Sequence, residues 1–69
     1  MTMTRAHFAM IAATLREEIE IAEGQYEVYG ARALRALAPT FADRLASTNP
    51  RFDRERFLAA ALPPERTDD

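Results

Sequence analysis

Few residues of this chain could carry out covalent chemistry. His7 is the only histidine and Ser47 the only serine, cysteine is absent, and all nine basic residues are arginine. A Ser–His–acid triad would have to use His7 and Ser47, and no glycine-rich turn surrounds Ser47. The absence of lysine excludes Schiff-base chemistry and a phosphate-loop lysine. We therefore expect a protein that is not an enzyme and has no catalytic or cofactor-binding residue, with His7 at the surface or in an interface.

The glutamates of the first half suggest a second kind of chemistry, the binding of a cation. A Ca²⁺ site usually needs a loop rich in Asp and Asn with a glycine at its turn, and this segment lacks such a loop, so we expect no metal site. Two tyrosines stand among the last of these glutamates, and tyrosine is common at interfaces between proteins. We interpret the segment as an acidic surface for a basic partner. The predicted partner-binding residues are Glu17, Glu20, Glu23, Tyr26, Glu27 and Tyr29.

Three arginines, Arg51, Arg54 and Arg56, lie around an expected turn between two helices. A helix-turn-helix protein places side chains from the start of its second helix in the major groove of DNA. Here the second helix would be short, no lysine supports it, and the whole chain has a net charge of −2. We therefore do not expect nucleic-acid binding as the main activity, and we keep a small DNA-binding regulator that uses these arginines as the alternative function.

The clearest of the expected elements is a helix over about residues 5–22. Thr4 is a suitable N-cap, with Thr2 as the alternative, and the helix should end near Gly24. Apolar residues recur at steps of three and four, which places them on one face of a helix. That face consists of Phe8, Ile11, Ala12, Leu15, Ile19 and Ala22.

Residues 23–30 are ambiguous. Tyr26 and Val28 alternate with polar residues as in a strand, but a lone strand would have no partner. We expect a connector whose tyrosines pack across the helices. The alternative is a helix that continues or starts early and is broken by Gly30.

A second helix is expected over about residues 31–48. One helical phase continues across Pro39, which favours a single kinked helix over two segments, although proline disfavours helical geometry before it. The apolar positions in this phase are Leu34, Leu37, Ala38, Phe41, Leu45 and Thr48.

Strong stop and start signals follow. Asn49-Pro50 should end the second helix, with Asn49 in a left-handed cap. Asp53 is placed as an N-cap, and Phe52 and Phe57 occupy the two positions of a hydrophobic staple. We predict a short helix over about residues 54–61, ended by Pro63-Pro64, and expect the core to contain Phe8, Phe41, Phe52 and Phe57.

Together these elements predict an all-α fold: a small bundle of two main helices and a short third one. Residues 1–64 would form one helical domain, with a polar tail at 65–69. A chain of 69 residues buries only about 60% of its unfolded surface, and without cysteines it cannot use disulfides. We therefore expect association, as a homodimer or within a larger complex, to complete the bundle. It would cover apolar residues left without partners: Met3, Met10, Ile21, Val28 and the tyrosines.

Charge and hydropathy patterns support this view. Residues 1–27 hold two Arg and five Glu, a net −3, whereas residues 28–56 hold six Arg, two Asp and one Glu, a net +3. Two copies could pair these halves.

No apolar run approaches the roughly 20 residues of a membrane span, and no signal peptide is recognisable, so we expect a cytoplasmic protein without membrane contact.

The opening Thr4-Arg-Ala-His-Phe8 and the segment from Phe41 to Ala61, with its Thr-Asn-Pro-x-Phe-Asp-Arg-x-Arg-Phe core, resemble small helical proteins of bacteriophages and prophages of high-GC bacteria. This resemblance implies a phage or mobile-element origin and a helical fold, and it transfers no site residue. From it, with the small size and the acidity, we expect an accessory protein that binds a host protein complex. Inhibition of a defence complex, as by anti-CRISPR-type proteins, is one concrete form.

Overall fold

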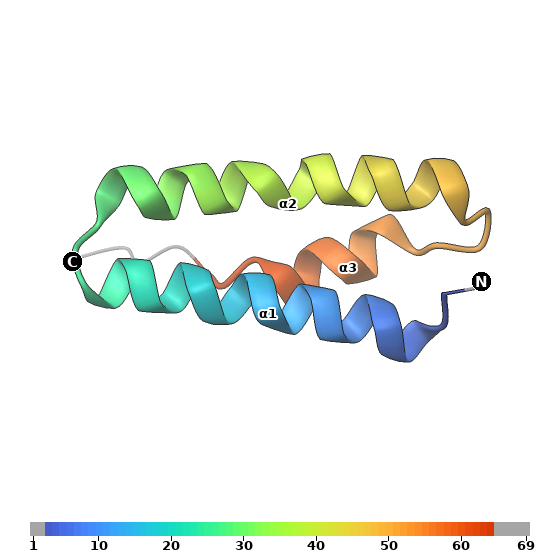
Figure 1. Ribbon diagram of the computed structural model, residues 1–69, viewed down its shortest axis with the longest axis horizontal. Coiled ribbons are helices and arrows are strands. Elements are labelled where there is room, and N and C mark those ends of the chain that lie inside the picture. Colours follow the sequence, from blue (N-terminus) through green and yellow to red (C-terminus); the bar gives the residue numbers. More distant parts are fainter. Residues whose placement is uncertain (1–2, 65–69) are drawn as a thin grey trace.

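The computed structural model describes residues 3–64, and within them the chain is entirely helical. It contains α1 (Arg5–Gly24), α2 (Val28–Thr48) and α3 (Arg54–Ala61). Helices α1 and α2 form an antiparallel hairpin, and the short α3 returns along both in the same direction as α1 (Figure 1). The predicted all-α arrangement of two long helices and a short third one is therefore confirmed. The predicted polar tail, residues 65–69, lies outside the described residues.

Helix α1 begins after Thr4, as predicted, and continues to Gly24. The backbone N–H of Thr4 donates to His7 Nδ1 at 3.0 Å. This is the reciprocal contact of a capping box, with an imidazole where Glu or Gln is usual. His7 is exposed, and its side chain caps the start of α1. The buried face of α1 consists of Ala12, Leu15, Ile19 and Ala22, all within the predicted stripe.

Our expectation for residues 23–30 was wrong in its main form. The connector is only Gln25-Tyr26-Glu27, and α2 starts at Val28, earlier than predicted. The early-starting helix of the alternative is present, but Gly30 lies inside it and does not break it. The tyrosines do not pack across the helices, since Tyr26 and Tyr29 are each 86% exposed.

Helix α2 runs without interruption through Pro39, as predicted, but its buried face differs from the expected one. The residues that it buries are Ala31, Ala38, Ala42 and Leu45. Leu37 and Phe41 remain 39% and 37% exposed, so Phe41 is not the core residue that we predicted. The reason is that α2 meets two helices at once, and its alanine face points between them. The larger side chains are thereby moved to the flank.

Asn49 ends α2 with an extended backbone, not with the left-handed cap that we expected. Its side-chain amide instead donates to the Leu45 carbonyl at 3.0 Å. Asp53 then caps α3 as predicted, because its carboxylate accepts from the Arg56 backbone N–H at 3.0 Å.

The predicted staple is also present, and it belongs to a larger aromatic cluster. The rings of Phe52 and Phe57 have centroids 5.4 Å apart, and Phe8 meets Phe52 edge-on at 4.8 Å. Phe57 is 4% exposed, whereas Phe8 and Phe52 are partly buried. Met3, which we expected to lack a partner, packs against this core. The cluster fastens the start of α3 to the start of α1.

This docking of α3 gives a first prediction. Asp53→Ala removes the cap and should lower the free energy of unfolding by about 0.5–2 kcal/mol. Phe57→Ala leaves a cavity at a buried position and should lower it by about 3–5 kcal/mol. Urea denaturation followed by circular dichroism measures both. Variants as stable as the parent protein would show that α3 is not docked in solution.

Candidate functional site

Four of the seven large hydrophobic side chains that are exposed among residues 3–64 lie at the end of the α1–α2 hairpin: Ile21, Tyr26, Val28 and Tyr29. We call these four residues, together with Glu27, the hairpin tip. Ile21 is 52% and Val28 60% exposed, and the two tyrosines are more exposed still. Three of the six predicted partner-binding residues, Tyr26, Glu27 and Tyr29, are therefore brought together here, and the two aliphatic residues add an apolar component.

The backbone of the tip is fixed by the end of α1. The N–H of Glu27 donates to the Ala22 carbonyl at 2.9 Å, and the N–H of Tyr26 donates to the Glu23 carbonyl at 3.2 Å. These two hydrogen bonds form a Schellman motif, which places one residue in the left-handed region. That residue is Tyr26, with φ of 58°. Glycine usually occupies this position, and the sequence supplies one at Gly24, two residues too early.

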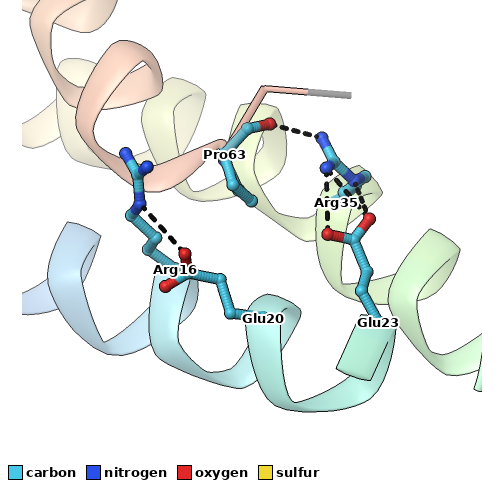
Figure 2. Close-up of polar contacts among 5 residues, drawn as sticks. All are labelled: Arg16, Glu20, Glu23, Arg35 and Pro63. Atoms are coloured by element: carbon cyan, nitrogen blue, oxygen red, sulfur yellow. Dashed lines mark hydrogen bonds and ion pairs between the residues drawn. The ribbon is translucent and has the colours of Figure 1, made fainter. Parts of the chain in front are cut away.

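Glu23, the predicted acidic residue of α1 that lies nearest the tip, forms an ion pair with Arg35. Its carboxylate lies 2.9 Å from Nη2 of Arg35 and accepts from Arg35 Nε at 3.0 Å. The same guanidinium donates through Nη1 to the Pro63 carbonyl at 3.0 Å, and Figure 2 shows it between these two partners. Both charged side chains are largely buried, at 20% and 28% exposed. This contact ties the segment after α3 to both long helices, and we call it the Arg35 clip.

The other predicted acidic residues differ in how free they are. Glu20 faces Arg16 one turn earlier at 3.8 Å, and both side chains are well exposed (Figure 2). Glu17 and Glu27 are exposed, and neither makes an ion pair or side-chain hydrogen bond with another residue of 3–64. Glu17 lies one turn before Ile21 on α1. Among the predicted partner-binding residues, the negative charges free to meet a partner beside the tip are therefore Glu17 and Glu27.

The three predicted nucleic-acid residues do not form one surface. Arg54 donates to Asp43 of α2 at 3.0 Å. Arg51 and Arg56 instead line a pocket of about 470 Å³ between α1 and α3. Arg5 lines the same pocket, and sequence reasoning missed it because it is distant in sequence and no local pattern links it to the other two.

Two further kinds of site are absent from residues 3–64. No group of three or more His, Asp or Glu side chains is placed there to hold a metal ion. No helix in the same range is long and apolar enough to cross a membrane.

Comparisons of the chain with protein-family models, with curated proteins and with solved structures found no match. The function is therefore inferred from the arrangement of the residues themselves. Two separate surfaces are available for binding: the hairpin tip, and the pocket that Arg5, Arg51 and Arg56 line.

The Arg35 clip gives a second prediction. Arg35→Gln should lower the free energy of unfolding by about 1–3 kcal/mol, because largely buried hydrogen bonds to a charged group are lost. Hydrogen exchange at the Leu62 amide, next to the released Pro63, should become faster. Arg16→Gln is the matched control, and loss of its long, exposed contact should cost less than about 1 kcal/mol. Equal effects of the two substitutions would contradict the clip.

Proposed function

We propose that this protein is a non-enzymatic binding protein that recognises another protein through its hairpin tip. The observation that carries the proposal is the conformation of Tyr26. A left-handed backbone costs a residue other than glycine roughly 1–2 kcal/mol, and the 86% exposed side chain recovers almost nothing by burial. Strained residues of this kind are concentrated at functional sites. Since glycine would be more stable at this position, the presence of a tyrosine there is best explained by its contact with a partner.

The residue types of the tip define the partner. Tyrosines supply large contact areas and a hydroxyl, and they are frequent among the residues that dominate binding energy. Ile21 and Val28 add an apolar surface, while Glu17 and Glu27 add negative charge. The complementary partner surface is an apolar depression with a basic rim.

A basic rim is also what a protein surface that holds nucleic acid offers. The resemblance to phage and prophage proteins makes a host protein complex the partner that we propose. Inhibition of a defence complex, by an acidic tip that occupies its nucleic-acid surface, is the concrete form of this proposal. The DNA-binding alternative is weaker, because Asp43 already occupies Arg54 and the other two arginines line a pocket.

Self-association is part of the proposal, and it uses a different surface. Helix α3 covers the flank of α2 that bears Arg35 and Asp43. The opposite flank carries Leu34, Leu37 and Phe41 at helical spacing, and two of these are more than a third exposed. We call this flank the open face. A second copy would bury it by completing a four-helix arrangement of the long helices.

A third prediction separates the binding role of Tyr26 from folding. Tyr26→Gly should raise the free energy of unfolding by about 1 kcal/mol, since glycine relieves the left-handed strain. The same substitution should weaken capture of host proteins, and Tyr26→Gly with Tyr29→Ala should abolish it. Denaturation measures the first effect, and affinity purification from host lysate with mass spectrometry measures the second.

Met10→Ala is the control for the tip variants, because Met10 is 60% exposed and lies away from the tip on α1. It should retain every captured protein. Capture that survives both tyrosine substitutions would refute binding through the tip. Retardation of duplex DNA that weakens steeply with salt and is lost in Arg51→Gln would instead support the DNA-binding alternative.

A fourth prediction concerns the homodimer. Because the stability of a dimer depends on protomer concentration, the melting temperature should rise as the protein is concentrated. Phe41→Glu on the open face should remove this dependence, whereas the exposed control Thr40→Glu should keep it. Sedimentation that shows a monomer at high micromolar concentration, with a melting temperature independent of concentration, would rule out the dimer.

A further inference from the structure

The pocket between α1 and α3 has no role in the function proposed above. Its volume of about 470 Å³ lies within the range of sites that hold small molecules, about 300–1,000 Å³. Four alanines and three phenylalanines make up most of its lining, and its polar residues are three arginines and Asp53. A mainly apolar cavity with a few charged groups is the usual composition of a ligand site.

Small residues on the facing sides of the two helices create the space. Ala9 and Ala12 of α1 and Ala60 of α3 contribute to its lining. Phe8 and Phe52 line it as well, and both are only partly buried, so their rings are available to a ligand. An apolar body could therefore pack against the alanines and the rings.

The charged residues of the pocket belong to the starts of the two helices and the turn before α3. Arg5 begins α1, and Arg51 and Arg56 flank the start of α3. These helices run in the same direction, so their N-termini lie at the same end of the molecule (Figure 1). None of the three arginine side chains makes an ion pair or hydrogen bond with another residue of 3–64. Asp53 is the single carboxylate in the lining, and it already accepts the Arg56 backbone N–H. The pocket thus has a positive end.

We propose that this pocket binds an organic carboxylate with an apolar body. Guanidinium groups bind carboxylates through paired hydrogen bonds, and they account for the head of such a ligand. The slot between the alanines and the phenylalanine rings accounts for its body. A nucleic-acid backbone fits less well, because its charges are spread along a strand, whereas here the charge lies at one end of an apolar cavity.

Titration of the protein with octanoate, followed by NMR, tests the proposal. We expect saturable shifts of the Ala9, Ala12 and Ala60 methyl signals and of the side-chain N–H signals of Arg5 and Arg56. Octan-1-ol has the same body without the charge, and acetate has the charge without the body. Octan-1-ol should bind at least about tenfold more weakly than octanoate because it loses a charge-assisted hydrogen bond or more. Acetate should also bind at least about tenfold more weakly, because it loses the apolar contacts of the body.

Three variants locate the ligand. Arg5→Gln and Arg56→Gln should each weaken octanoate binding by about tenfold, and Ala60→Leu should block the slot without changing any charge. Arg54→Gln is the matched control, because Arg54 lies on α3 but outside the pocket lining. It should bind octanoate as the parent protein does. Amide spectra of each variant verify that it is folded.

Several results would overturn the proposal. Equal binding of octanoate and octan-1-ol would show that the arginines do not select the head. Octanoate affinity unchanged in Arg5→Gln, Arg56→Gln and Ala60→Leu would place the ligand elsewhere. Binding of an oligothymidylate or an acidic peptide, without any octanoate binding, would assign the pocket to a macromolecule. Binding of oligothymidylate would also favour the DNA-binding alternative, because Arg51 and Arg56 line the pocket. The other results do not involve the hairpin tip, so they leave the proposed function intact.

Discussion

The fold depends on the close approach of three helices at alanine positions. Ala12 of α1, Ala38 and Ala42 of α2, and Ala61 of α3 are all between 0% and 1% exposed. Among residues 3–64, Ile19 is the only large side chain that is buried as completely. Because alanine side chains are small, the helix backbones can approach each other closely. Close approach increases the dispersion attraction between the packed atoms. Such a core is thin, and the aromatic cluster around Phe57 supplies the larger apolar contribution that fixes α3.

A thin core determines where the remaining apolar residues lie. Because the alanine face of α2 points between α1 and α3, Leu37 and Phe41 are left on the open face. Because the hairpin turns within three residues, Ile21 and Val28 remain at its end. The surfaces that we propose for partners are therefore consequences of the packing. Other alanines, among them Ala9 and Ala60, line the pocket between α1 and α3.

Local patterns in the sequence predicted the helices, and they did so where short-range interactions decide the outcome. The Asp53 cap and the Phe52–Phe57 staple depend on residues no more than five positions apart in the sequence, so their spacing was sufficient. The buried face of α2 was predicted poorly, because it depends on how two other helices divide the surface of α2 between them. A single hydrophobic stripe does not contain that information. Tyr26 was misplaced because a left-handed tyrosine opposes the ordinary preference for glycine.

The candidate sites show the same division. Tyr26, Glu27 and Tyr29 could be grouped from the sequence because they are neighbours in the chain. Only the structure shows that Glu23 forms an ion pair with Arg35. The sequence likewise could not predict that Arg5 lines the same pocket as Arg51 and Arg56, because only tertiary packing brings α1 and α3 side by side.

The resulting molecule has different chemistry at its two ends. The N-terminal end of α1 gathers arginines around an apolar pocket, while the other end presents tyrosines beside free glutamates. The Arg35 clip lies near the second end and holds the segment after α3 against both long helices. By occupying Glu23, it reduces the negative charge beside the tip and leaves its apolar and aromatic residues more prominent. Affinity at this end should therefore depend on burial of the tyrosines more than on ion pairs, since exposed ion pairs contribute little in water.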